Sequence, residues 1–231
     1  MYYGEGDVSV LLALSNASCY RLNGARVSKD VLAIEENKQG QSGGNGMVMR
    51  ASYCGEPVVL KRLKIAGMAD DLSNKGIERE YRIGAGLRSN YIVQHLGKPS
   101  SPRGGKELLL EACHGKTLDK QIKSSVFQRL NDQEKLIYLK NYMAQMLIAV
   151  QYIHENDIAH KDLKPENFMF KDRALGAQLK LLDFGAAVDF KVDDREQLYH
   201  ETFGWLNQAT LFYTPPEDAT YRGLTQFPEN E

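Results

Sequence analysis

Residues 160 to 167 read His-Lys-Asp-Leu-Lys-Pro-Glu-Asn, and an Asp-Phe-Gly run follows at 183 to 185. These motifs combine carboxylates, an amide and ammonium groups. A phosphoryl transfer needs such groups, because the protein supplies positioning and charge neutralisation rather than covalent chemistry. A positioned base such as Asp162 accelerates a reaction by roughly 10²- to 10⁴-fold. Asn167 and Asp183 offer the hard oxygen ligands that Mg²⁺ prefers. Asp-Phe-Gly alone is an ordinary turn, but its combination with the octapeptide indicates a catalytic site.

The two motifs together resemble those of the protein kinase superfamily, over about residues 31 to 217. Lys164 resembles the serine/threonine class. The resemblance implies that Asp162 is the catalytic base, that Lys164 neutralises the transferred phosphoryl group, and that Asn167 and Asp183 bind Mg²⁺. The implied reaction is the transfer of a phosphoryl group from ATP to serine or threonine hydroxyls of protein substrates.

A glycine-rich stretch, 43 to 46, precedes Val48 and a lysine, Lys61, on a β-branched segment. Glycine lets a backbone approach phosphates closely, although such a stretch alone is also typical of a flexible turn. Gln41 stands where the kinase pattern has its first glycine. The resemblance implies a gatekeeper at Leu110 and adenine contacts from the backbone at 111 to 113. The implied nucleotide-binding residues are Gly43, Gly46, Val48, Val59, Lys61, Leu110, Glu111, Cys113 and Met169.

Lys61 needs an opposing charge if it lies in an apolar cleft, because breaking a buried ion pair costs about 3–5 kcal/mol. Glu80 shares one helical face with Ile77, Ile83 and Leu87, so its side chain is predicted to point inward and pair with Lys61. We therefore assign Lys61 and Glu80 to the catalytic residues. A surface partner for Glu80 is the alternative. The neighbouring Glu78 is predicted to face solvent beside Lys75 and Arg82.

Two glycines, Gly84 and Gly86, occupy the second half of this helix, and each costs about 1 kcal/mol relative to alanine. Gly84 stands where the kinase family places an apolar residue of its regulatory spine. We expect a soft or short helix. Such a helix implies an activating partner that orders it, or a site that is only partly competent.

A second helix is predicted over 132 to 153, capped by Asn131 or Asp132. Its role is to hold the catalytic loop that follows. Its apolar residues recur at steps of three and four and predict one buried face. These residues are Leu136, Leu139, Met143, Met146, Val150 and Ile153.

The segment from Gly185 to the Pro-Pro-Glu run at 215 to 217 resembles an activation segment. Its hydroxyls at Tyr199, Thr202 and Thr210 are candidates for phosphorylation or simple loop polarity. Lys161 stands where many regulated kinases have arginine, and lysine lacks the bidentate fork of arginine.

Composition is typical of a soluble globular enzyme, with 231 residues, 42% hydrophobic, 26% charged and a net charge of −1. Nothing in these values suggests a nucleic-acid binder. The apolar run at 8 to 14 is too short for a membrane span. Three widely spaced cysteines, Cys19, Cys54 and Cys113, are expected to be free thiols, which favours the cytoplasm or another reducing soluble compartment.

The resemblance implies an α+β, bilobal fold with a small antiparallel sheet, one regulatory helix and a mainly helical second lobe. We assign 1–30 to an extension of unknown role, 31–114 to the first lobe and hinge, and 115–231 to a partial second lobe. The family continues well beyond the Pro-Pro-Glu run, whereas this sequence stops at Glu231. We therefore expect later helices to be missing and the apolar face of the helix at 132 to 153 to be partly bare.

Two functions are weighed from these patterns. The favoured one is an ATP-dependent protein serine/threonine kinase, because every charged position of the site is filled. The alternative is a catalytically weak pseudokinase, or a truncated nucleotide-binding or scaffold module, signalled by Gln41, Gly84 and Lys161. A small-molecule kinase of similar fold is less favoured, because Lys164-Pro165 and the Pro-Pro-Glu run resemble kinases of protein substrates.

Overall fold

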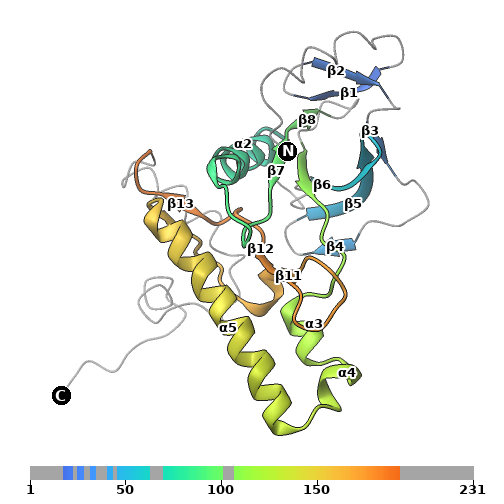
Figure 1. Cartoon of the computed structure of the whole chain (residues 1–231). Coiled ribbons are helices and arrows are strands. Elements are labelled where there is room, and N and C mark those ends of the chain that lie inside the picture. The colour runs from blue at the N-terminus through green and yellow to red at the C-terminus, as the bar shows by residue number, and fades with distance from the viewer. Residues whose placement is uncertain are drawn as a thin grey trace, which may run out of the picture. The chain divides into compact units, whose positions relative to one another are not determined.

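The computed structural model describes the backbone of residues 18–22, 25–28, 32–34, 41–43, 46–62, 70–100 and 107–192, and side chains within 47–62, 75–99 and 107–192. The chain divides into two compact units, residues 1–114 and 115–231 (Figure 1). The first contains an antiparallel sheet and a helix, and the described part of the second, up to residue 192, has a helix as its longest element, together with four short strands. The expected α+β class is therefore confirmed.

The main sheet of the first unit has the strand order β3-β5-β6-β9-β7, and β4 pairs with β5. All of these pairings are antiparallel. The β5–β6 hairpin turns through Cys54 and Gly55, with φ of 51° and 84°, which is typical of a two-residue type I′ turn. The strands are β3 (Leu32–Ile34), β4 (Gln41–Gly43), β5 (Gly46–Tyr53), β6 (Glu56–Arg62), β7 (His95–Gly97) and β9 (Leu108–Glu111).

A second, smaller sheet includes the segment whose role the sequence left open. Strands β1 (Ser18–Leu22) and β2 (Ala25–Ser28) form a hairpin, and β1 also pairs with β8 (Pro99–Ser100). The N-terminal extension therefore contributes two strands to the first unit.

Helix α2 (Asp70–Gly86) has 17 residues, so the short alternative of the predicted soft or short helix is wrong. The predicted inner face is confirmed: Ile77, Glu80, Ile83 and Leu87 are each at most 2% exposed. Glycine is compatible with this length for two physical reasons. Gly86 is the last residue of the helix, where glycine is common, and a neighbouring side chain packs directly against Gly84.

The second unit begins with two short helices, α3 (Leu118–Ile122) and α4 (Ser125–Gln128), which are capped by the side chains of Thr117 and Ser124. Helix α5 (Asp132–Glu155) follows. Strand β10 (Ile158–Ala159) pairs with β13 (Val188–Asp189), and β11 (Phe168–Phe170) pairs with β12 (Leu179–Leu181). The short 3₁₀ helix η2 (Pro165–Asn167) lies just before β11.

Asn131 caps α5, so the first of the two predicted caps, Asn131 and Asp132, is confirmed. Its side chain accepts a hydrogen bond from the Glu134 amide, and the Glu134 carboxylate accepts one from the Asn131 amide, each at 2.9 Å. This reciprocal capping box satisfies two amides that the helix cannot pair internally.

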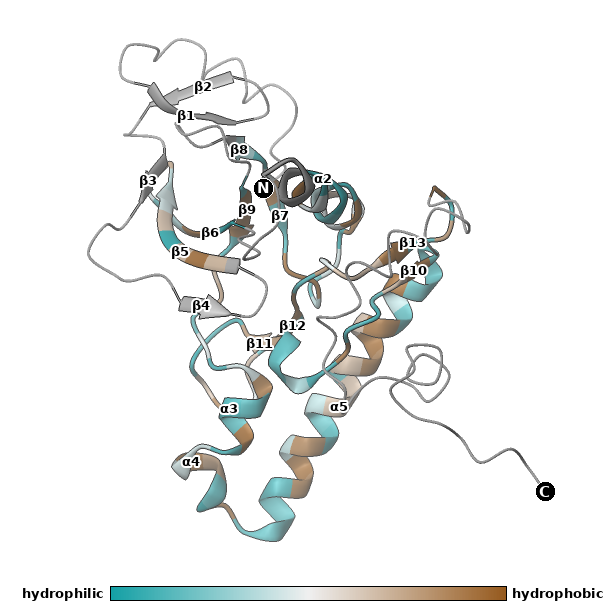
Figure 2. Cartoon of the chain, turned by 180° about the vertical axis from the view of Figure 1, so that it is seen from behind, coloured by the Kyte–Doolittle hydropathy of each residue, from teal (hydrophilic) through white to brown (hydrophobic). Residues whose placement is uncertain are grey.

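The predicted buried face of α5 is largely wrong. Leu136, Leu139 and Met143 are 51%, 40% and 54% exposed, and within the predicted set only Ile153 is fully buried. The expectation of a partly bare apolar face is met at these three residues. Figure 2 shows hydrophobic residues recurring along α5.

The face of α5 that does pack is more aromatic and polar than the predicted one. The buried Tyr142 ring meets Phe170 of β11 edge to face, with centroids 4.9 Å apart. The side-chain oxygen of Gln145 accepts a hydrogen bond of 2.7 Å from the Leu179 amide of β12. These contacts join α5 to β11 and β12, the paired strands that follow the catalytic loop in the sequence, which explains why the Tyr142 and Gln145 face is turned inward. None of the described helices is both long enough and apolar enough to cross a membrane.

Candidate active site

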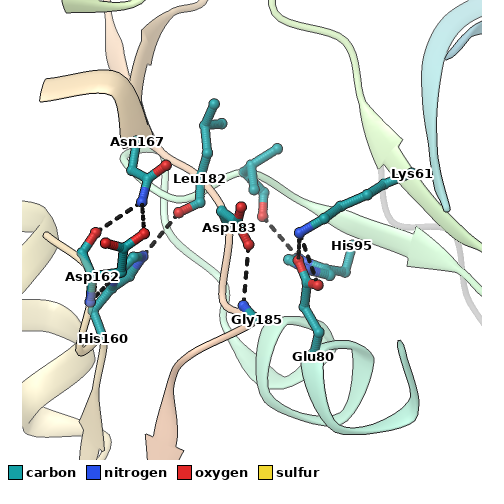
Figure 3. Close-up of polar contacts among 10 residues, drawn as sticks. Lys61, Glu80, His95, His160, Asp162, Asn167, Leu182, Asp183 and Gly185 are labelled. Atoms are coloured by element: carbon teal, nitrogen blue, oxygen red, sulfur yellow. Dashed lines mark hydrogen bonds and ion pairs between the residues drawn. The ribbon is translucent and has the colours of Figure 1, made fainter. Parts of the chain in front are cut away.

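The first unit buries an ion pair between β6 and α2. The ammonium nitrogen of Lys61 lies 2.8 and 2.9 Å from the two carboxylate oxygens of Glu80 (Figure 3). The side chains are 8% and 1% exposed. The ion pair that the helical spacing predicts is therefore present, and both carboxylate oxygens accept a hydrogen bond. Glu78, by contrast, is 38% exposed and forms an ion pair with Lys98.

Strand register places several candidate nucleotide-binding residues on the same face of the sheet as Lys61. Val48 of β5 is directly opposite Lys61, and Val59 lies two residues before Lys61 on β6. Leu110 of β9 is directly opposite Val59. Because directly opposed residues in an antiparallel pair share a face, all four side chains point to one side. Val48 is 40% exposed, so its apolar surface is accessible for contact.

The glycine-rich segment forms the β4–β5 hairpin, in which Gly43 and Gly46 are directly opposed. Two residues separate them in the sequence, and these lie outside the described part of the chain. At the other end of the sheet, β9 runs into the predicted hinge. The Glu111 amide donates to the carbonyl of Gln94 at 3.0 Å, and the Cys113 side chain is half-buried.

The second unit holds the catalytic loop, in which Asp162 is buried. One carboxylate oxygen, Oδ2, accepts hydrogen bonds from Asn167 at 2.9 Å and lies 2.7 Å from the ammonium of Lys164. The other oxygen, Oδ1, is buried and has no hydrogen-bond partner among the described residues. A buried acceptor without a partner is costly, and such atoms occur where a ligand or reactant supplies the missing donor.

The geometry of Asn167 assigns its two amide functions. Its Nδ2 donates to the carbonyl oxygen and to Oδ2 of Asp162, at 2.8 and 2.9 Å. The amide oxygen is therefore the atom that remains suited to a cation. Figure 3 shows Asn167 and Asp162 pointing toward one another.

Asp183 lies one residue beyond Leu182, whose amide donates to the Asn167 carbonyl at 2.8 Å. Asp183 has a φ of 58°, in the left-handed region that aspartate tolerates better than most residues. Its Oδ1 accepts a 3.2 Å hydrogen bond from the Gly185 amide. The backbone thus connects the two predicted metal ligands, Asn167 and Asp183, through a single hydrogen bond.

His160 was quoted in the sequence motif without a role, and the structure gives it a positioning one. It is 2% exposed, and its Nδ1 accepts a 3.3 Å hydrogen bond from the Asp162 amide. Its Nε2 therefore carries the hydrogen and donates to the Leu182 carbonyl at 2.8 Å. Burial lowers the pKa of His160, which outweighs the opposing effects of the Leu182 carbonyl and of Asp183 and Asp162. A neutral His160 thus joins the backbone at Asp162 to the backbone at Leu182.

Of the remaining predicted residues, Met169 and Lys161 are described by the structure and the activation-segment residues are not. Met169 is half-buried on β11 and forms an isolated bridge with Thr117. Lys161 is exposed, with a φ of 64°. The candidate activation-segment residues lie outside the described residues; these are Tyr199, Thr202, Thr210 and the Pro-Pro-Glu run at 215 to 217.

The oxygen atoms of Asn167 and Asp183 suit Mg²⁺, which needs few protein ligands, better than a metal ion whose ligands all come from the protein. No group of three or more histidine, cysteine or acidic side chains with metal-binding geometry occurs among the described residues. Mg²⁺ does not require one, because it is commonly bound by one or two carboxylates together with substrate phosphates and water. Asp183 and the amide oxygen of Asn167 fit that requirement.

Comparison with known proteins gives a consistent identification. The family model described as the protein kinase domain matches residues 35–226. The chain is 30% identical to human cyclin-dependent kinase 20 over 76% of this chain and 46% of that protein. It is 29% identical to the Drosophila melanogaster serine/threonine-protein kinase grp, over 71% of this chain and 28% of that protein.

A shorter match is more similar in sequence. Calcium-dependent protein kinase 6 of Plasmodium berghei is 43% identical over 48% of this chain, which corresponds to 6% of that protein. The chain therefore spans less than half the length of each of these three relatives. Because the family model matches most of the sequence, including both motifs, the chain belongs to the protein kinase domain family.

Proposed function

We propose that this protein transfers the γ-phosphoryl group of ATP to serine or threonine hydroxyls of protein substrates. The observation that carries the proposal is the arrangement around Asp162. Its Oδ2 is engaged by Lys164 and Asn167, while its buried Oδ1 has no partner among the described residues. An incoming hydroxyl supplies the donor that Oδ1 lacks, so Asp162 accepts or orients the hydroxyl proton.

The charged side chains divide the remaining work. Lys164 is 15% exposed and its ammonium lies 2.7 Å from Oδ2 of Asp162, so its charge is held beside the carboxylate that accepts or orients the proton. Lys61 is oriented by both oxygens of Glu80 and neutralises phosphate charge on the nucleotide. Val48, Val59 and Leu110 provide an apolar sheet face for the adenine ring.

Asn167 and Asp183 would hold Mg²⁺ through one oxygen each. Bound Mg²⁺ neutralises the charge on the phosphate oxygens of ATP. The hydrogen bond from Gly185 to Asp183 and the pair of hydrogen bonds from Asn167 to Asp162 fix the orientation of both side chains before a ligand binds.

The serine/threonine preference rests on Lys164, which resembles that class, and on the printed name of one relative, grp. Proteins are the proposed substrates, and an activating protein that orders α2 is a proposed partner. Cys54 and Cys113 form no disulfide among the described residues, which is compatible with a reducing compartment such as the cytoplasm.

The test is a transfer assay with labelled ATP, a mixture of basic proteins as acceptors, and either Mg²⁺ or a chelator. We expect Mg²⁺-dependent labelling of serine and threonine in the acceptors. Asp162→Asn is expected to lower the rate by roughly 10²- to 10⁴-fold. Asparagine keeps an oxygen toward Lys164 and Asn167, so the loop retains its contacts.

Two results would contradict the proposal. Labelling that persists in Asp162→Asn would mean that another group, or a contaminating enzyme, performs the transfer. ATP binding without transfer in the unmodified chain would favour the alternative, a nucleotide-binding module without catalytic activity.

A further inference from the structure

The side chain of His95 occupies the space beside Gly84. A Cβ atom added at Gly84 would lie 2.2 Å from Cε1 of His95, 2.3 Å from Nδ1 and 2.4 Å from Nε2. All three ring atoms are thus closer than any real Cβ contact allows. His95 is only 4% exposed, and Gly84 is also buried. The imidazole therefore occupies the space that a Cβ at position 84 would need, and no side chain fits there while the ring is present.

Gly84 and His95 lie on the same faces of the helix and of the sheet as the two members of the buried ion pair, Glu80 and Lys61. Gly84 lies four residues after Glu80 on α2, so the two residues share a helix face one turn apart. On the sheet, His95 is directly opposite Leu110, Leu110 is opposite Val59, and Leu108 is opposite Lys61. His95 and Lys61 therefore project from the same face of the sheet.

The ring of His95 is oriented by the backbone just before its own strand, β7. Its Nδ1 lies 3.3 Å from the carbonyl oxygen of Val93, to which it donates in the tautomer that carries the Nδ1 hydrogen. An oriented, buried ring between the sheet and a glycine sets how closely α2 approaches the sheet, because protein interiors are close-packed and transmit such displacements.

We propose that His95 is a positioning residue for the Lys61–Glu80 pair. Its ring, which projects from strand β7, fills the space of the side chain that Gly84 lacks. The ring thereby sets the distance between α2 and the sheet at which Glu80 reaches Lys61. The contact also explains how α2 continues through Gly84. For its effect on catalysis, the inference rests on the proposed function.

The experiment compares His95→Ala with a matched control in the same sheet. The control is Leu109→Ala, because Leu109 is fully buried and pairs with Leu60 on the opposite face from His95. The rescue variant combines His95→Ala with Gly84→Leu, which moves the missing volume from the strand to the helix. Hydrogen exchange of the α2 amides and the kcat and KM for ATP are measured for each variant, together with the melting temperature.

We expect His95→Ala to accelerate amide exchange in α2 at least tenfold and to lower kcat/KM for ATP at least tenfold. Leu109→Ala is expected to lower the melting temperature with little effect on either quantity. The double variant should recover most of the α2 amide protection and most of the kcat/KM for ATP. Gly84→Leu alone should lower both quantities, because the leucine side chain clashes with His95. If His95→Ala does not fold, His95→Gln provides a smaller change in the same direction.

Unchanged α2 exchange in His95→Ala would overturn the inference, as would equal losses in Leu109→Ala. The exchange measurement does not require catalysis. If the unmodified chain transfers no phosphoryl group, the proposed function fails, while α2 exchange still decides the role of His95.

Discussion

Two buried acids in this protein are held in different ways. Both oxygens of Glu80 accept hydrogen bonds from the Lys61 ammonium, at 2.8 and 2.9 Å. Asp162 uses only Oδ2 for Lys164 and Asn167, and its Oδ1 has no partner among the described residues. The two acids are similarly buried, at 1% and 8% exposure, so burial alone does not explain the difference.

The difference indicates two tasks. A carboxylate with both oxygens engaged fixes the position of its partner and has no reason to change during a reaction. A carboxylate with one buried, unpaired oxygen carries a cost in the resting protein that a reacting hydroxyl removes. Glu80 is thus an anchor, and Asp162 is the group prepared for proton transfer.

Removing the anchor is expected to give the largest loss of stability. Glu80→Gln removes the charge opposite Lys61 in a site where both side chains are nearly inaccessible, and should cost about 3–5 kcal/mol of unfolding free energy in urea denaturation. The control is Glu78→Gln on the same helix, whose partly exposed pair with Lys98 should be worth about 0–1 kcal/mol. Equal losses in the two variants would contradict the distinction.

Removing the hydrogen bonds that hold Asp162 should lower the unfolding free energy less than removing the charge of Glu80. Asn167→Ala removes two hydrogen bonds to Asp162 and leaves a buried carbonyl with fewer donors, for an expected loss of about 1–3 kcal/mol. Asn141→Ala is the control, because Asn141 is exposed and its side-chain oxygen accepts an exposed hydrogen bond from Gln145 one turn away on the same helix. A loss in Asn167→Ala no larger than in Asn141→Ala would mean that the loop does not depend on this amide.

The capping box of α5 tests whether the catalytic loop depends on its supporting helix. Asn131→Ala should cost about 1 kcal/mol in urea denaturation, because the Glu134 amide loses its acceptor. Asn131→Asp keeps an oxygen at that position and should lie within a few tenths of a kcal/mol of the unmodified chain. A full loss in Asn131→Asp would show that the effect does not arise from the cap.

The smallest expected effect is a dependence of stability on pH through His160. Burial lowers the pKa of His160 in the folded chain below its ordinary value of 6.5. As pH falls below about 6.5, the unfolded chain gains a proton that the folded chain resists, so the unfolding free energy decreases. Above that pH, His160 contributes no pH dependence.

His160→Phe removes the titrating group and keeps a ring against Phe184, whose centroid lies 5.2 Å from that of His160. Urea denaturation between pH 8 and pH 5.5 should show a smaller decline for this variant than for the unmodified chain. An identical decline in both would assign the pH dependence to other groups.

Local sequence patterns predict the first unit better than the second. The face of α2 followed from spacing alone, because its apolar residues and Glu80 all pack inward. The face of α5 did not, because the apolar stripe at Leu136, Leu139 and Met143 is exposed while Tyr142 and Gln145 make the contacts. Periodicity identifies which residues share a face, but the packing partner decides which face is buried.

The catalytic motifs predicted the acids and the amide of the site but not the groups that orient them. His160 bonds to Leu182, 22 residues away in sequence, and His95 packs against Gly84 across two elements. Contacts of this kind depend on how strands and helices meet, and neither spacing nor composition encodes them. Gly84 was a visible irregularity in the sequence, and its explanation required the position of His95.

The most direct test of the roles proposed for Asp162 and Asp183 is a thermal melt with and without Mg²⁺ and ATP. It is made on the unmodified chain, Asp162→Asn and Asp183→Asn. A ligand at a hundred times its dissociation constant stabilises by about 2.7 kcal/mol. We predict that the unmodified chain and Asp162→Asn both gain stability only when metal and nucleotide are present, and that Asp183→Asn loses this gain. Loss of the gain in Asp162→Asn, or its full retention in Asp183→Asn, would contradict the roles assigned to the two aspartates.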